Sequence, residues 1–161
     1  MAKGKPEERP GRRGQGEPGR RRGRRAHGSS SEEAAKVNGI ATATLPKSAS
    51  RAVEACFERN ARNGVVLDLR AISNATDWFV IVSGDSDTHV RAIAEHVLDS
   101  LGEEGMRPAG VEGLSAGRWV LIDYIDAVIH VFHPTAREFY SLERLWGDAP
   151  TWTLEDPAEE L

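Results

Sequence analysis

The sequence predicts a single α/β domain in which helices cover a mixed β-sheet. Segments with apolar residues at helical spacing alternate with short segments rich in β-branched and aromatic residues. The expected order is helix, strand, strand, helix, short strand, strand, strand, helix. The 161 residues are 39% apolar and 29% charged, a soluble globular mix. A domain of this size buries about two thirds of its unfolded surface, so it needs neither metal nor disulfide.

The first predicted helix begins near Ser48 and ends near Gly64, a residue suited to a left-handed cap. Its apolar stripe consists of Ala49, Ala52, Val53, Cys56 and Phe57. Residues 65–70 alternate between two faces, which is typical of a half-buried strand. Residues 78–82 are apolar throughout, which predicts a central strand.

The second predicted helix follows residues 84–87, whose polar side chains suit an N-cap. Its apolar residues recur at i, i+3, i+4, i+7 and i+11, namely Val90, Ile93, Ala94, Val97 and Leu101. Residues 107–113 are expected to form a short edge strand, because Pro108 lacks the N–H that a central strand needs.

The strands expected at residues 118–124 and 127–132 form a predicted β-hairpin. A last helix is expected from Pro134, with Phe139, Leu142, Leu145 and Trp146 at helical spacing. Three of the four tryptophans and both tyrosines lie from residue 117 onward. So many aromatic residues indicate either a core or a partner surface. We expect one hairpin face to join Phe139, Leu142 and Trp146 in the core, and the other to face outward.

Charge divides the chain into a basic arm and an acidic body. Residues 1–28 hold ten Lys/Arg and three Glu, a net +7, whereas the remaining residues carry −11. We predict a disordered Arg/Gly-rich arm over residues 1–45, the α/β domain over 46–148, and a loose acidic tail over 149–161. Clustered arginines can bind RNA by displacing counterions from its phosphates, but a loose terminus of no function explains the same composition.

The chemistry of the chain suits a cytoplasmic protein. Cys56 is the only cysteine and cannot form an intrachain disulfide, which fits a reducing compartment. No apolar run approaches the roughly 20 residues that span a bilayer, and no apolar segment follows the N-terminal charges as in a secretory signal. We therefore expect no membrane partner.

The loop Gly84-Asp85-Ser86 is the strongest candidate for catalysis. A serine hydrolase would pair it with a late Asp-x-x-His, but His130, not an aspartate, stands three residues before His133. Metal-dependent nucleotidyl transfer needs two carboxylates two apart on one strand face, whereas Asp123 and Asp126 are three apart. We expect no catalytic residue and no cofactor. A small hydrolase or nucleotidyltransferase using this loop remains the alternative.

A metal site is also not expected. His130 and His133 are three residues apart, a spacing that sends strand side chains to opposite faces. His130 is instead expected to be a strand histidine with a hydrogen-bond partner.

Several sequence blocks, taken together in order and spacing, resemble the ribosomal silencing factor family, also called RsfS or Iojap. The resemblance covers about residues 50–148. The blocks are Thr76-Asp77-Trp78-Phe79-Val80-Ile81, Ser83-Gly84-Asp85-Ser86, His89-Val90, Val111-Glu112-Gly113, Trp119-Val120-Leu121-Ile122-Asp123-Tyr124, Asp126, Val131-Phe132-His133 and Phe139-Tyr140-x-Leu142-Glu143-x-Leu145-Trp146.

The resemblance implies a fold similar to the nucleotidyltransferase core without its catalytic carboxylates. It also implies binding to the large ribosomal subunit through the ribosomal protein numbered fourteen. Occupying that surface would keep the small subunit from joining and slow translation when nutrients are short. The free protein is expected to be a homodimer. The basic arm lies outside the resemblance.

Two positions depart from what several relatives carry. Several relatives have asparagine at the position of Asp85 or glycine at the position of Ile125. The isoleucine at position 125 is expected to stiffen the hairpin turn. The candidate partner-binding residues are Trp119, Tyr124, Asp126, His130 and Phe132, with Trp119 as the anchor. Each could instead be buried in the sheet, and alternation sends Trp119 and Tyr124 to opposite faces. An acidic body suits a basic ribosomal protein and is repelled by RNA.

Overall fold

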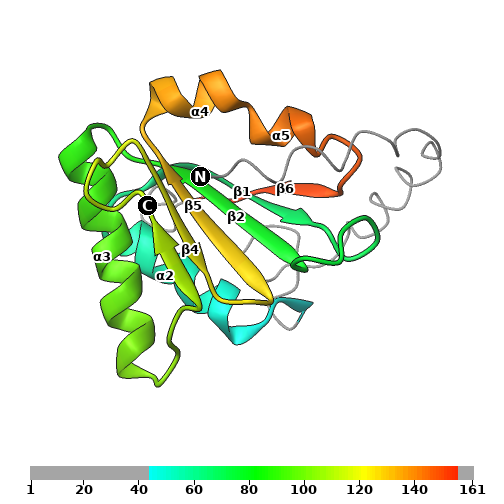
Figure 1. The fold of residues 1–161 in the computed structure, drawn as a ribbon, viewed down its shortest axis with the longest axis horizontal. Helices are drawn as coiled ribbons and strands as arrows, with labels where there is room; N and C mark the ends of the chain where they lie inside the picture. Colours follow the sequence, from blue (N-terminus) through cyan, green and yellow to red (C-terminus); the bar gives the residue numbers. More distant parts are fainter. Residues whose placement is uncertain (1–43, 156–161) are drawn as a thin grey trace.

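The computed structural model describes residues 44–155, which form a six-stranded β-sheet with helices on both faces (Figure 1). The predicted single mixed α/β domain is confirmed. The predicted disordered arm, apart from its last two residues, lies outside the described residues, as do residues 156–161 of the predicted tail.

Helix α3, Asp87–Glu103, forms where the sequence predicts it. Its five predicted core residues are fully buried. Ser86 is the N-cap, and its Oγ accepts a hydrogen bond from the His89 backbone N–H at 3.1 Å. The polar loop before this helix therefore satisfies a helix terminus, as expected from its composition.

Helix α2, Lys47–Glu58, ends six residues earlier than predicted. The chain turns from α2 into β1 through Asn60 and Asn63, which have φ of 62° and 52°. Asparagine occurs here because it tolerates the left-handed region better than most residues. Strand β1, Arg62–Asp68, therefore already includes Gly64. Gly64 permits close packing, since an added Cβ would lie 3.1 Å from Leu154 Cδ1.

The sheet order is β3-β4-β5-β2-β1-β6. Strands β2 and β5 pair in parallel at its centre, and every other pairing is antiparallel. All six residues of β2 are buried, which confirms the predicted central strand. The bounds of the strands not yet described are β2 Trp78–Ser83, β3 Gly110–Glu112, β4 Trp119–Asp123, β5 Ala127–Phe132 and β6 Thr151–Thr153.

The predicted hairpin is confirmed. Its turn contains a non-glycine residue, Ile125, in the left-handed conformation. Ile125 has a φ of 77° and is 65% exposed. Its N–H donates to Asp123 Oδ1 at 2.8 Å, and Thr76 Oγ1 donates to its carbonyl oxygen at 2.9 Å. These bonds hold a conformation that isoleucine disfavours.

The segment predicted to be a loose tail contributes an edge strand. Strand β6 pairs antiparallel with β1, and Ala149 and Leu154 on either side of it are buried. A domain boundary at residue 148 is therefore wrong, because the sheet and core continue to Leu154. Three strand residues carry too little periodicity to be recognised from sequence.

The last predicted helix is two short helices, α4 Pro134–Tyr140 and α5 Leu142–Leu145. Ser141 separates them with a left-handed φ of 45°. Residues on either side of this break no longer share one helical face. Leu142 is buried as predicted, but Phe139 is 78% exposed and is not part of the core.

The sheet separates two apolar layers. Helices α2 and α3 pack on one face, where Val66, Val80 and Ile129 are fully buried. The short helices α4 and α5 cover part of the other face, where Leu67, Ile81 and Phe132 are buried (Figure 1). The smaller cover leaves the end of this second face over β4 partly open, with Trp119 and Leu121 only half-buried.

Burial of two ionisable groups predicts a loss of stability in alkali. It raises the pKa of the Cys56 thiol from 9.0 to about 12 and the pKa of the Tyr124 hydroxyl from 10.0 to about 12. Above pH 9 the unfolded chain loses protons that the folded chain keeps, so the contribution of these two groups to the free energy of unfolding should be constant below pH 9 and fall between pH 9 and 12. Urea denaturation at a series of pH values measures this.

The matched variant is Tyr124→Phe. Within residues 44–155 the Tyr124 hydroxyl is buried without a hydrogen-bond partner, so its removal should not lower stability at pH 7. The decline above pH 10 should become shallower. An unchanged alkaline decline in the double variant with Cys56→Ala would contradict the assignment to these two groups.

Candidate interaction surface

Three aromatic side chains form a partly exposed surface on the second face of the sheet. We define the aromatic patch as Trp119 on β4 with Phe139 and Tyr140 on α4. The Trp119 and Tyr140 ring centroids are 4.6 Å apart, and those of Phe139 and Tyr140 are 4.9 Å apart. Phe139 is 78% and Tyr140 49% exposed, while Trp119 is half-buried. The patch thus joins a strand and a helix.

The patch rests on a buried base of residues from β5 and β2. The Trp119 ring stacks on Phe132, its cross-strand neighbour, with 4.9 Å between centroids. Trp119 Nε1 donates to His130 Nδ1 at 3.1 Å, which confirms the hydrogen-bonded strand histidine. Phe79 meets the His130 ring edge-on at 4.4 Å. The base therefore fixes the orientation of Trp119.

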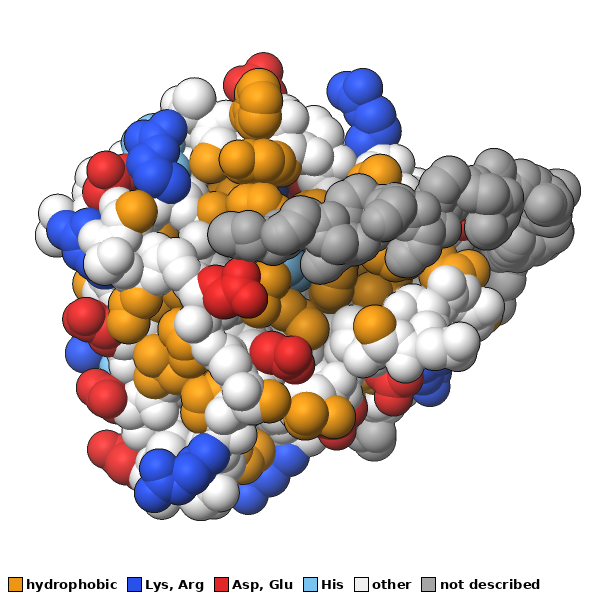
Figure 2. All heavy atoms as spheres, in the orientation of Figure 1, with side chains coloured by type: hydrophobic (Ala, Val, Ile, Leu, Met, Phe, Trp, Pro, Cys, Tyr) orange, Lys and Arg blue, Asp and Glu red, His pale blue; other side chains and the backbone are white. Residues whose placement is uncertain are grey.

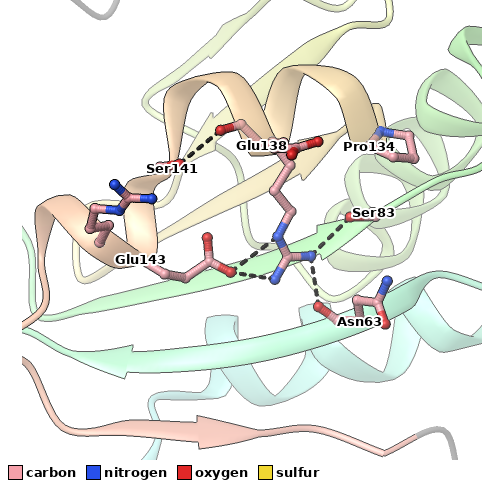
Figure 3. Close-up of a pocket in the computed structure, with 8 residues that line it drawn as sticks. Asn63, Ser83, Pro134, Glu138, Ser141 and Glu143 are labelled. Atoms are coloured by element: carbon pink, nitrogen blue, oxygen red, sulfur yellow. Dashed lines mark hydrogen bonds and ion pairs between the residues drawn. The ribbon is translucent and has the colours of Figure 1, made fainter.

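Arg137 attaches α4 to the sheet beside the patch. Its Nη1 donates to the Asn63 carbonyl oxygen at 2.7 Å and to Ser83 Oγ at 2.9 Å. Its Nε and Nη2 donate to Glu143 Oε2 at 3.1 and 2.6 Å. These bonds cross a shallow pocket of about 490 Å³ between α4 and the sheet (Figure 3). Because the guanidinium is engaged by protein groups, we assign this pocket a structural role.

Three acidic residues lie on the elements that carry the patch or pair with them. Glu112 lies opposite Leu121 on the same sheet face, Asp123 follows two residues further along β4, and Glu138 precedes Phe139. We call these three residues the acidic rim. Within residues 44–155 none of the three forms an ion pair. Figure 2 shows hydrophobic side chains gathered over the sheet and α4, with acidic side chains beside them.

Only two of the five predicted contact residues reach the surface. Trp119 is half-buried in the patch, and Asp126 is exposed at the hairpin turn. Tyr124 is 6% exposed and lies in the layer under α2 and α3, on the face opposite Trp119 as alternation predicts. His130 and Phe132 are buried beneath the patch. They are covered because β5 lies between β4 and β2 and is buried along its whole length.

Sequence reasoning missed the most exposed part of the patch. The sequence predicts one uninterrupted helix, which puts Phe139 in the core and assigns no place to Tyr140. The available signal was Ser141, a weaker helix former than Leu142 and one that bonds readily to nearby backbone. Its Oγ donates to the Glu138 carbonyl oxygen at 2.8 Å at the helix end.

The loop considered for catalysis is engaged in holding the fold together. Ser86 caps α3, and the Asp85 N–H donates to His89 Nδ1 at 2.8 Å. His89 Nε2 donates to the Arg59 carbonyl oxygen at 2.7 Å. His133 Nδ1 accepts from the Thr135 N–H at 3.1 Å and so caps α4. These histidines act as connectors between backbone segments.

Over residues 44–155, no three His, Cys, Asp or Glu side chains lie close enough together to hold a metal ion. None of the helices in that part of the chain is long and apolar enough to cross a membrane.

Residues 42–161 match the family model RsfS, described as ribosomal silencing factor during starvation. The chain is 43% identical to "Ribosomal silencing factor RsfS" of Bacillus subtilis over 104 residues, 65% of this chain and 88% of that protein. It is 34% identical over 92 residues to "Mitochondrial assembly of ribosomal large subunit protein 1" of Mus musculus, 55% of this chain and 40% of that protein.

Solved structures resemble the domain as well. A crystal structure of a protein from Chromobacterium violaceum has a TM-score of 0.61 and 34% identity, covering 63% of this chain and 84% of that one. A second, from Bacillus halodurans, has a TM-score of 0.58 and 39% identity, covering 65% and 94%. The family model extends past β6, in agreement with the place of that strand in the sheet.

Proposed function

The chain belongs to the ribosomal silencing factor family, and we propose that it represses translation by binding the large ribosomal subunit. The proposed contact is the ribosomal protein numbered fourteen, on the surface where the small subunit docks. Bound there, the protein would keep the small subunit from joining when nutrients are limited. Such blocking requires occupancy and no turnover, so the proposal is a binding module that acts in the cytoplasm.

The aromatic patch is the observation that carries this proposal. Exposed aromatic residues that cluster at the centre of a surface contribute most of the binding energy in many protein interfaces. Here Trp119 is already held by His130 and Phe132, so binding would immobilise few additional side chains. Low ordering cost leaves more of the contact energy available as affinity.

The charge around the patch supports a basic protein as the partner. The acidic rim puts Glu112, Asp123 and Glu138 on β3, β4 and α4, the strands and helix that carry or adjoin the patch, without ion-pair partners in the described domain. Residues 44–155 contain ten Lys/Arg and 17 Asp/Glu, a net −7. Complementary charge favours a Lys/Arg-rich protein face and disfavours RNA phosphates.

The names of two relatives support the ribosome as the place of action. One is called a ribosomal silencing factor, and the mouse relative is named for assembly of the large ribosomal subunit. We further propose that the free protein is a homodimer, as the family resemblance implies. Analytical ultracentrifugation of the free protein tests this part separately.

Co-sedimentation with purified ribosomal subunits tests the main proposal. The protein should pellet with large subunits and not with small subunits, and prior binding should reduce the amount of joined ribosomes formed on mixing. Failure to pellet with large subunits would contradict the binding step. Pelleting without any effect on joining would contradict the blocking step.

A further inference from the structure

We propose that Arg137 is a positioning residue for the aromatic patch, because its hydrogen bonds fix α4 where Phe139 and Tyr140 can contact a partner. The effect on docking rests on the proposed function, whereas the effect on α4 belongs to the free protein. We define the Arg137 latch as the Arg137 guanidinium with its three acceptors, the Asn63 carbonyl oxygen, Ser83 Oγ and Glu143 Oε2.

Helix α4 has little apolar contact to hold it in place. Of its seven residues only Ala136 is buried, and the four-residue α5 adds only Leu142. The left-handed Ser141 keeps the two helices from forming one longer helix. A helix of about two turns is not stable by itself, because its few hydrogen bonds do not repay the cost of starting it. The position of α4 therefore depends largely on polar contacts with its surroundings.

The latch joins α4 to three other elements (Figure 3). Arg137 Nη1 donates to Asn63 near the start of β1 and to Ser83 at the end of β2. Nε and Nη2 donate to Glu143 of α5. The Arg137 side chain is only 13% exposed, so these bonds are shielded from water. Because the donors of a guanidinium point in fixed directions, one side chain sets both the distance and the orientation of α4.

The latch attaches α4 to the end of the sheet that carries Trp119. Ser83 pairs with Phe132 in the parallel ladder of β2 and β5, and Phe132 pairs with Trp119 in the ladder of β4 and β5. Helix α4 in turn places the Tyr140 ring against Trp119 and the Phe139 ring against Tyr140. A shift of α4 would separate these two rings from Trp119 and divide the patch.

The sign of the charge effect separates positioning from attraction. Residues 44–155 are net −7, and the proposed partner is basic. Replacing Arg137 by methionine removes a positive charge from this acidic domain. On charge alone the replacement would strengthen binding to a basic protein. A positioning role predicts the opposite, because the patch would no longer be held together.

Arg144→Met is the matched control. Arg144 lines the same pocket as Arg137 but is exposed. Within residues 44–155 its side chain forms no ion pair. The control therefore removes the same charge beside the patch and leaves the acceptors of the latch in place. Its binding to large subunits should be unchanged or slightly tighter.

The test measures equilibrium binding of the full-length variants to large ribosomal subunits, together with hydrogen–deuterium exchange of the free proteins. Arg137→Met should bind at least about fivefold more weakly than the unmodified protein. The N–H groups of residues 137 and 141, which bond within the turns of α4, should exchange faster. Those in the middle of α3 should change only as far as the free energy of unfolding changes.

A double-mutant cycle with Phe139→Asp separates positioning from a general loss of stability. If Arg137 acts by placing Phe139, the aspartate should cost less affinity in Arg137→Met than in the unmodified protein. A general loss of stability that leaves most of the protein folded would not link the two residues. The two losses of affinity would then simply multiply.

The outcomes keep this inference apart from the proposed function. Equal binding by Arg137→Met and the unmodified protein would overturn the inference and leave the proposed function intact. Equal losses in Arg137→Met and Arg144→Met, or losses that multiply with Phe139→Asp, would overturn it as well. Failure of the unmodified protein to bind large subunits would instead contradict the proposed function. Exchange in α4 would still decide in the free protein whether the latch fixes the helix, and unchanged exchange in Arg137→Met would overturn that.

Discussion

Phe139→Asp is expected to weaken binding to the large ribosomal subunit by at least about 30-fold, or about 2 kcal/mol, without lowering the free energy of unfolding. Phe139 is 78% exposed, and its one ring contact within residues 44–155 is with Tyr140. Its replacement therefore removes little buried area but places a carboxylate where an apolar partner surface would dock. Equilibrium binding to large subunits and urea denaturation measure the two effects.

Ile72→Asp is the matched control for this variant. Ile72 is also an exposed large apolar residue, at 44%, and it follows β1 in the chain. The register places Trp119 with Phe132 and Ser83 at one end of the sheet, whereas β1 ends opposite Trp78 at the other end. Binding by Ile72→Asp should be nearly unchanged. Equal losses in both variants would indicate a general charge effect and would argue against the patch.

Trp119→Ala is a less selective test of the same surface. Trp119 stacks on Phe132 and donates to His130, so truncation would also open space in the second apolar layer and leave the histidine without its indole donor. A loss of binding in that variant would combine lower stability with loss of contact. The Phe139→Asp variant separates the loss of contact from the loss of stability, because Phe139 is exposed.

The parts of the fold that were predictable are those in which burial is complete and the signal is local. Helix α3 shows five core residues at helical spacing, and β2 is apolar on both faces because neighbours and helices cover it entirely. Strand β6 has no such signal, since its three residues are ordered by pairing with β1, far away in the sequence. The break at Ser141 has only a weak local signal, a serine whose hydroxyl donates to the Glu138 carbonyl oxygen.

The candidate site shows the same division. Alternation separated Trp119 from Tyr124 correctly, because the two sides of a strand follow from backbone geometry. Alternation does not say how far a helix layer extends over each side. Helices α4 and α5 are short, so Trp119 stays partly open, while β5 is flanked by strands on both sides and its His130 and Phe132 are buried.

Gly113→Ala is expected to cause the largest loss of stability, about 3 kcal/mol, by adding a strained left-handed alanine to a backbone collision. Gly113 has a φ of +83°, and a Cβ there would overlap the Trp119 carbonyl oxygen. Relief requires moving either the turn or the first residue of β4, which carries the indole of the patch. Subunit binding should therefore fall together with the free energy of unfolding.

Gly110→Ala is the matched control for Gly113→Ala. It adds a methyl group to the same edge of the sheet without the left-handed φ and without the backbone collision. Gly110 is in β3, its φ lies outside the left-handed region, and an added Cβ there meets nothing within 4 Å. Alanine also lowers the entropy of the unfolded chain, so this variant should be as stable as the unmodified protein or slightly more stable. Urea denaturation measures the free energy of unfolding of both variants. Similar stability in the two would mean that the chain between β3 and β4 can move without displacing Trp119, and the patch would then not depend on that turn.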